Sequence, residues 1–405
     1  MDRGPTSSMT DHDSILADLI VALDGAPAAR MVDVSSLALR RRLPIRAVWM
    51  YVVDYSEDQL RLVTTHVGPQ PSTKEMSVRG TVAGRAYMSR EVMEAEGDDG
   101  LVVWAPVFRR SESVGVLGLA LGRDEEEVRR LAPAIAMVVG SAVLGAKRHS
   151  DVFELARGAQ HLRLASAMQW DLLPLPTYKD PLAEVAGRVE PAYDIGGDAF
   201  DFAANDEAME IGVFDAMGHG LRATLLTTLA VGAYRYGRRR PGQLTGVAGD
   251  IDEAVQNHVE GEAFVTGHLC RLDLATGELA WMNCGHPLPL LIRDHAASPI
   301  EGARPSLPFG LGTEPVDPVV ISLQPDDIVL FYSDGVIEAR PDGGPEFGME
   351  RFVDLATRHG DRDVGLLVMV RAILDAVLEH AENILRDDAT LVAVRWTGPS
   401  TSAVR

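Results

Sequence analysis

The sequence predicts two α/β domains joined by a helical linker. Its 405 residues exceed one ordinary domain and are enough for two separate hydrophobic cores. Apolar runs of strand length alternate with helical runs in both halves of the chain. Between the halves, apolar residues recur at three- and four-residue steps up to Pro174, where proline ends a helix. We place the first domain at 13–147, the linker at 148–173 and the second domain at 174–397.

The chain is strongly acidic, with a formal net charge of −21. Phosphate backbones repel acidic surfaces, and lysine occurs only at Lys74, Lys147 and Lys179. The composition therefore argues against a nucleic-acid partner. An acidic excess aids solubility, and it can also collect divalent cations.

Cysteine content and the apolar segments indicate a cytoplasmic protein without a membrane span. Cys270 and Cys284 form neither a zinc pattern nor a disulfide framework, as expected in a reducing compartment. The N-terminal segment lacks the apolar core of a signal peptide. The uncharged run 131–146 is shorter than the roughly 20 residues that a bilayer requires, and it contains Pro133. We expect this run to be a buried helix.

The first domain is expected to place a sheet between helices. A helix is predicted at 13–39 and a short one at 81–89, and helices continue from about 125 through 146. Four strands are predicted between them, at 48–55, 59–66, 101–108 and 114–121.

Three segments of this domain resemble a GAF domain over 13–147: GTVAGRAYMSREVM, WAPVF and SVGVLGLAL. The resemblance implies either a small-molecule sensor or a module for dimer contacts, so a homodimer through this domain and the linker helix is expected. His66 is the only histidine in the sheet-forming region and cysteine is absent there, which argues against haem or a covalent bilin. The linker helix can transmit a rotation or a register shift, or it can be a passive spacer.

Four aspartate positions of the second domain stand at strand ends or tight turns. Asp198 follows two glycines, Asp215 ends a strand, Asp334 ends another before glycine, and Asp387-Asp388 precede a strand. Each alone reads most simply as a turn former.

Together, adjacent strands could bring these carboxylates to one edge. Clustered carboxylates repel one another unless they are protonated or metal-bound, and hard oxygen ligands favour Mg²⁺ or Mn²⁺. Two such ions about 3.5–4 Å apart can hold a hydroxide and orient a phosphoryl group for in-line attack.

The second domain resembles the SpoIIE/RsbU-type PPM phosphatases over about 165–397. The segments that carry this resemblance follow in the family's order: IGGDAFDF, FDAMGHGLRATLL, NCGHPLPLL, PFGLG, FYSDGVIEARPDGGPEFGMERF and RDDATLVAV. It implies an αββα sandwich with two Mn²⁺ or Mg²⁺ ions. The ligands that it implies are Asp198, Asp215, Asp334 and Asp387, with Asp215 bridging both ions and the carbonyl of Ala216 as a further ligand. Asp387 is preferred to Asp388 because it holds the first place of the Asp-x-x-Thr pattern.

The sequence departs from the family pattern at four positions, none of which removes a carboxylate. They are Phe200, Ala216, Met217 and Cys284. No arginine matches the phosphate-binding arginine of the eukaryotic type 2C relatives, so the means of holding phosphate stays open.

His219 and His286 are expected to shape loops rather than bind metal, although His219 could lie near the bound hydroxide.

The resemblance also implies a substrate, a phosphoserine or phosphothreonine on an anti-sigma-factor antagonist. Thiol phosphatases are excluded, because Thr276 and Leu290 stand where the arginine of C-x₅-R belongs. The run 250–252 lacks the residues of an aspartyl-phosphate motif and is expected on a surface helix, and no Gly-Lys pair makes a P-loop. Two other functions remain open: a phosphatase-like protein that binds a partner without turnover, and a small-molecule receptor acting mainly through the first domain.

Overall fold

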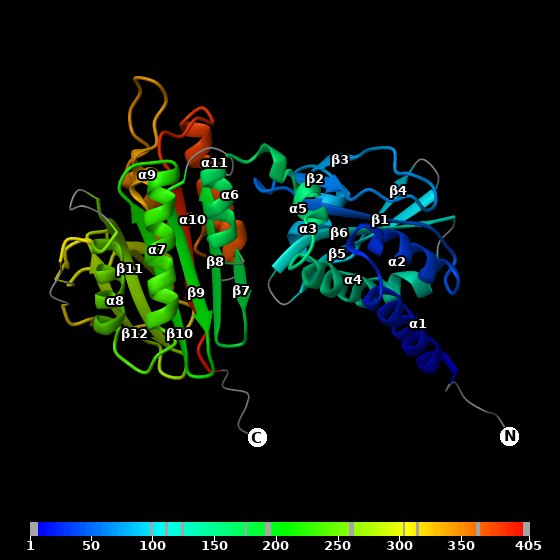
Figure 1. Cartoon of the computed structure of the whole chain (residues 1–405), viewed down its shortest axis with the longest axis horizontal. Helices are drawn as coiled ribbons and strands as arrows, with labels where there is room; N and C mark the ends of the chain where they lie inside the picture. Colours follow the sequence, from blue (N-terminus) through cyan, green and yellow to red (C-terminus); the bar gives the residue numbers. More distant parts are fainter. Residues whose placement is uncertain are drawn as a thin grey trace. The chain divides into compact units, whose positions relative to one another are not determined.

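The structure is a computed structural model in which the chain forms two compact units, 1–161 and 162–405. It describes residues 7–399 except 98–99, 110–111, 123–124, 175, 191–195, 259–262, 303, 313–315 and 362–364. Figure 1 shows both units and labels many of their helices and strands.

The N-terminal unit is built on a six-stranded antiparallel sheet of order β3-β2-β1-β6-β5-β4. Its strands are β1 (Ile45–Val53), β2 (Gln59–Leu62), β3 (Glu75–Ser77), β4 (Met93–Gly97), β5 (Gly100–Arg109) and β6 (Glu112–Leu121). Its longer helices are α1 (Ser7–Asp24), α2 (Met31–Arg40), α3 (Val82–Ser89) and α4 (Glu126–Ala146).

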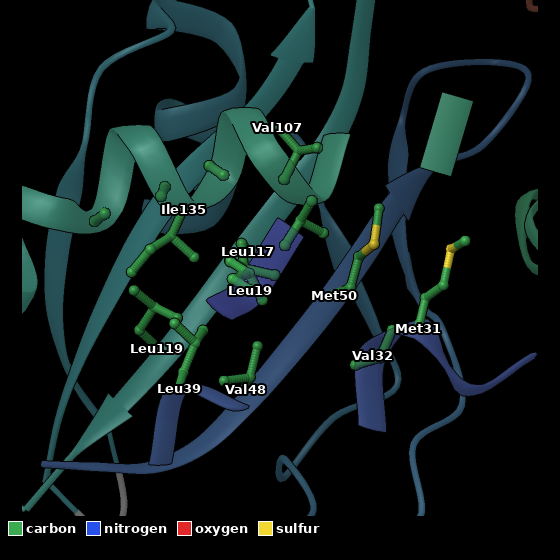
Figure 2. Close-up of a cluster of buried hydrophobic side chains, with 14 of the residues drawn as sticks. Leu19, Met31, Val32, Leu39, Val48, Met50, Val107, Leu117, Leu119 and Ile135 are labelled. Atoms are coloured by element: carbon green, nitrogen blue, oxygen red, sulfur yellow. The ribbon is translucent and has the colours of Figure 1, made fainter. Parts of the chain in front are cut away.

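One face of this sheet packs against α1, α2 and α4. Figure 2 shows Leu19 of α1, Leu39 of α2 and Ile135 of α4 meeting strand residues such as Val48 and Leu117, and all five are buried. Among the described residues, α4 is the one helix long and apolar enough to cross a membrane. Its buried residues recur at helical spacing and pack on the sheet, which is the arrangement expected for a core helix.

The structure differs from two sequence predictions in this unit. The single helix predicted at 13–39 is two helices, because Gly25 and Pro27 separate α1 from α2 and a short 3₁₀ turn (Ala28–Arg30) lies between them. The sheet also contains β3 and β4, two short edge strands that were not predicted. Their sequences, EMS and MEAEG, are too short and polar to show a clear alternation.

The predicted linker is not one continuous helix. It contains α5 (Val152–Arg157), a 3₁₀ turn (Ala159–His161) and α6 (Leu164–Leu172). Gly158 ends α5 with a φ of 100°, a left-handed conformation that glycine adopts without strain.

The C-terminal unit contains two antiparallel sheets that face each other. The first has the order β15-β12-β11-β10-β9 and the second β14-β13-β16-β17-β8-β7. The first is formed by β9 (Asp198–Ala204), β10 (Ala208–Ala216), β11 (Val265–Asp273), β12 (Glu278–Cys284) and β15 (Val319–Ser322). The second is formed by β7 (Thr177–Lys179), β8 (Ala183–Glu190), β13 (Leu290–Arg293), β14 (Ala296–Pro299), β16 (Ile328–Tyr332) and β17 (Ala389–Trp396).

Three buried clusters define the layers of this unit. Residues of both sheets, including Val213, Trp281 and Val392, form the core between them. Helices α7 (Leu221–Gly237) and α8 (Leu244–Gln256) cover the first sheet. Helices α10 (Met349–His359) and α11 (Leu366–His380) cover the second. The order is helix, sheet, sheet, helix, as expected for an αββα sandwich.

Candidate metal centre

Asp198 and Asp215 lie opposite each other on neighbouring strands of the first sheet. Asp198 opens β9, Asp215 is the second-last residue of β10, and the register pairs the two. Directly paired residues project to the same face of a sheet, so both carboxyl groups lie on one side at one end of the strands.

Asp334, Asp387 and Asp388 stand at the corresponding ends of two paired strands of the second sheet. Asp334 begins the short helix α9 (Asp334–Glu338) just after β16, and the pair 387–388 precedes β17. A Cβ atom on Gly335 would lie only 2.1 Å from the carbonyl oxygen of Asp388. A glycine is therefore required where these two chain segments cross.

The five carboxyl groups differ in burial. Asp198 and Asp388 are 2% and 1% exposed. Asp215 and Asp334 are half-buried, and Asp387 is exposed. The Oδ2 atom of Asp198 and the Oδ1 atom of Asp388 have no hydrogen-bond partner among the described residues. Two deeply buried carboxylate oxygens are thus left without a donor.

Burial and mutual repulsion raise the pKa values of four of these groups, Asp198, Asp215, Asp387 and Asp388. Burial, followed by the charges of Asp334 and Asp387, raises the pKa of Asp215 to about 7. Burial is also the main cause that raises the pKa of Asp388 to about 7. The pKa of Asp198 is raised well above its usual range by burial and by the charges of Asp215 and Asp388. The groups therefore share one electrostatic site in which negative charge is costly.

A divalent cation fits this site chemically. It would supply the positive charge that buried, mutually repelling carboxylates lack, and hard oxygen donors are the ligands that Mg²⁺ and Mn²⁺ prefer. Among the described residues, however, no three His, Cys, Asp or Glu side chains are close enough together to enclose an ion. The fit consequently rests on the unpartnered Oδ2 atom of Asp198 and on the negative charge of the cluster.

The loop after β10 carries the next two predicted residues. Ala216 is buried at the end of β10, where its N–H donates to the Gly197 carbonyl at 3.2 Å. His219 is exposed just before α7. Burial raises the pKa of Asp387 and Asp334 adds to this effect, whereas the His219 ring opposes it. His219 therefore lies at the edge of the carboxylate cluster.

His286 shapes a buried turn. The Asn283 amide accepts from the His286 N–H at 2.8 Å and donates to the His286 carbonyl at 2.9 Å. The Nδ1 atom of His286 lies 2.8 Å from the Thr266 hydroxyl. These contacts agree with the expected role in shaping a loop.

Sequence reasoning missed Gln169, which reaches the same site from α6. Its amide is buried and contacts the Asp388 carboxylate at 2.9 Å. The one signal in the sequence was its helical spacing from Ala165 and Ser166, which places a polar side chain on a buried face.

Comparison with known proteins finds relatives of the C-terminal unit. Residues 205–397 match the family model described as Stage II sporulation protein E (SpoIIE). This range contains Asp215, Asp334 and Asp387, and it begins after Asp198. Most of the C-terminal unit is thus similar to the SpoIIE family model.

The individual relatives share less than 30% sequence identity with this chain. Protein IcfG of Synechocystis sp. is 22% identical over 70% of this chain and 46% of its own length. Phosphoserine phosphatase RsbU of Bacillus subtilis is 20% identical over 58% of this chain and 69% of its own length. Among solved structures, the RsbU and RsbW domains of Rv1364c from Mycobacterium tuberculosis are 28% identical over 56% of this chain and 62% of theirs, with a TM-score of 0.46. The chain spans about half the length of the Synechocystis relative.

Proposed function

We propose that this chain is a metal-dependent protein-serine/threonine phosphatase whose C-terminal unit holds two Mn²⁺ or Mg²⁺ ions. The proposed ligands are Asp198, Asp215, Asp334 and Asp387, together with the carbonyl of Ala216. The observation that carries the proposal is the gathering of buried carboxyl groups from both sheets within a SpoIIE-type domain. When bound, the ions would supply a hydroxide nucleophile and offset the charge of the phosphoryl group.

The residues of the chain have separable tasks in this proposal. Asp215 interacts with Asp198 of its own sheet and with Asp334 of the other, which suits a carboxylate shared between two ions. Asp388 accepts a hydrogen bond from the Asp198 N–H at 3.1 Å and fixes the start of β9. It would orient the ligands without being one of them.

Substituting Asp334→Asn tests the activity. The wild-type chain with Mn²⁺ should hydrolyse p-nitrophenyl phosphate, and the variant should lose this hydrolysis by a factor of at least about 100. Asp206→Asn is the matched control, because Asp206 is exposed in the turn at the opposite end of β9 and β10. If the wild type hydrolyses no phosphoester with Mn²⁺, the phosphatase proposal fails and the partner-binding alternative remains.

We further propose that the substrate is a phosphoserine or phosphothreonine on an anti-sigma-factor antagonist and that the protein acts in the cytoplasm. Two relatives carry the name phosphoserine phosphatase, RsbU and RsbP of Bacillus subtilis. The test is incubation with Mn²⁺ and the phosphorylated antagonists encoded in the same genome, followed by phosphate release. Release from free phosphoserine alone would contradict a protein substrate.

We propose a second function, small-molecule binding, for the GAF-like N-terminal unit. A cavity of about 380 Å³ lies on the α3 face of the sheet, between the strands and the segment 69–73. Trp49, Tyr51 and Trp104 line it, and the Tyr51 and Trp104 rings meet edge to face at 5.7 Å.

The polar atoms of two of these aromatic residues are already used. The Trp49 Nε1–H donates to the Pro69 carbonyl at 2.8 Å, and the Tyr51 hydroxyl donates to the Thr73 carbonyl at 2.6 Å. They hold the covering segment and leave apolar ring surface toward the cavity, which suits a small planar, mostly apolar ligand.

Calorimetric titration of the full chain with indole should show saturable binding, and Trp104→Ala should abolish this binding. An unchanged isotherm in this variant would place the binding elsewhere.

The sequence predicts a homodimer through this unit and the linker helix. Ile20 and Val21 of α1 and Met137 of α4 are 53%, 75% and 54% exposed, and a groove lies between these helices. We propose that this apolar surface pairs two chains. Sedimentation of Val21→Glu should then show a monomer where the wild type is a dimer.

A further inference from the structure

A buried glutamine amide links α6 to the carboxylate cluster. Gln169 is 3% exposed, and α6 packs against α7 and β9 within the C-terminal unit. A buried amide that makes no hydrogen bonds destabilises the folded chain, because it has lost its hydrogen bonds to water. The hydrogen-bond partners of the Gln169 amide therefore indicate its role.

Both hydrogens of the Gln169 amide nitrogen are used at the site. Nε2 donates to the Asp198 carbonyl at 2.8 Å and to Oδ2 of Asp388 at 2.9 Å. Both partners are oxygen acceptors, so the amide nitrogen, not the amide oxygen, must face them. The same Oδ2 atom also accepts from the Asp198 N–H at 3.1 Å.

This contact extends to the second sheet. The Ser333 hydroxyl donates to the Asp388 carbonyl at 3.2 Å and accepts from the Thr390 N–H at 2.9 Å. Ser333 directly precedes Asp334. One connected set of hydrogen bonds therefore joins α6, the start of β9, the end of β16 and the start of β17, and three of these segments carry candidate ligands.

We propose that Gln169 is a positioning residue that sets the spacing of the metal-binding carboxylates by holding Asp388 against the backbone of Asp198. This inference rests on the proposed function. Gln169 would touch neither metal nor substrate, and its effect would pass through hydrogen bonds that orient the ligands. Loss of such an outer partner commonly weakens metal affinity by about 10–100-fold.

The test compares Mn²⁺ binding by the metal-free full-length chain and by Gln169→Leu, using calorimetry. We expect the dissociation constant for Mn²⁺ to rise at least about tenfold. We also expect kcat for p-nitrophenyl phosphate to fall while KM changes less than about twofold, and added Mn²⁺ should recover part of kcat. Gln256→Leu is the matched control, because Gln256 is exposed on α8.

A second variant separates positioning from a general loss of structure. Gln169→Glu keeps the shape of the side chain but replaces the donating amide with a carboxylate beside Asp388, so it should weaken Mn²⁺ binding while the metal-free chain stays folded. Should Gln169→Leu fail to fold, Gln169→Glu decides the matter alone.

The outcomes distinguish this inference from the proposed function. Unchanged Mn²⁺ affinity in a folded Gln169 variant overturns the positioning role and leaves the phosphatase proposal standing. A wild type that binds Mn²⁺ but hydrolyses nothing overturns the phosphatase proposal, and the affinity comparison still decides the role of Gln169. A wild type that binds no Mn²⁺ overturns both.

Discussion

Gly335 and Asp388 approach so closely that a methyl group on the glycine would lie 2.1 Å from the aspartate carbonyl oxygen. The obstacle is backbone, and the same carbonyl accepts the Ser333 hydroxyl. Backbone held in this way cannot yield as the end of a flexible side chain can.

Substituting Gly335→Ala should therefore displace the start of β17 relative to α9. We expect the free energy of unfolding to fall by about 1–3 kcal/mol and Mn²⁺-dependent hydrolysis to be lost. Urea denaturation and a phosphoester assay measure the two effects. Gly249→Ala on α8 is the control, since a Cβ there meets nothing within 4 Å and alanine favours a helix. Full activity in Gly335→Ala would show that the site tolerates the displacement.

Substituting Asp198→Asn should stabilise the metal-free chain but reduce the stabilisation that Mn²⁺ provides. Burial and the charges of Asp215 and Asp388 disfavour the ionised form of Asp198, and Asp198→Asn removes this cost, so the metal-free variant should melt at a higher temperature than the metal-free wild type. Mn²⁺ at 100 times its Kd should stabilise the wild type by about 2.7 kcal/mol and raise its Tm accordingly. The Tm of the variant should rise much less. Differential scanning calorimetry with and without Mn²⁺ measures both. A metal-free variant that melts lower than the wild type would contradict the repulsion.

Asp33 should make the stability of the N-terminal unit depend on pH. Its buried carboxylate accepts hydrogen bonds from the Thr65 hydroxyl and the His66 N–H, each at 2.7 Å. Burial alone would raise the pKa of Asp33, but these bonds and the Arg30 guanidinium lower it overall. The stabilisation is therefore present above the ordinary aspartate pKa of about 3.9 and is lost as the pH falls through the lower folded-state pKa.

The corresponding measurement compares urea denaturation of the wild type and Asp33→Asn between about pH 7 and pH 3. At neutral pH the variant should be less stable by about 1–3 kcal/mol, because a buried donor loses its charged acceptor. The difference in unfolding free energy between the wild type and Asp33→Asn should decrease as the pH approaches about 3. Asp18→Asn, which alters an exposed ion pair with Arg42, should change stability by less than about 1 kcal/mol at either pH. A difference that stays constant with pH would contradict the lowered pKa.

The sequence was informative about the carboxylates for a physical reason. Each lies where an apolar strand begins or ends beside glycine or a turn, and that pattern is local. Asp215 and Asp334 could be assigned to strand ends without knowledge of which strands pair. The layers of the C-terminal unit followed from family resemblance, since the local pattern does not specify which sheet a strand joins.

Contacts between segments far apart in the sequence could not be predicted from such local patterns. Gln169 and Asp388 are 219 residues apart, and nothing near either one indicates the other. Asp252 was expected on a surface helix, yet it is buried and its carboxylate accepts from the Gly310 N–H at 2.7 Å. The helix was predicted correctly, but its buried face depends on a loop that arrives from elsewhere.

The distribution of the carboxylates over two sheets also has a consequence for biosynthesis. Asp198 and Asp388 are separated by 190 residues, and β17, which follows Asp388, lies between β16 and β8 in the second sheet. While the ribosome is still making β16, the first sheet can form, but the second cannot close. If the C-terminal unit binds metal as proposed, its site would be complete only after β17 has been synthesised and has paired with β16 and β8. A chain that ends before β17 should then bind no metal.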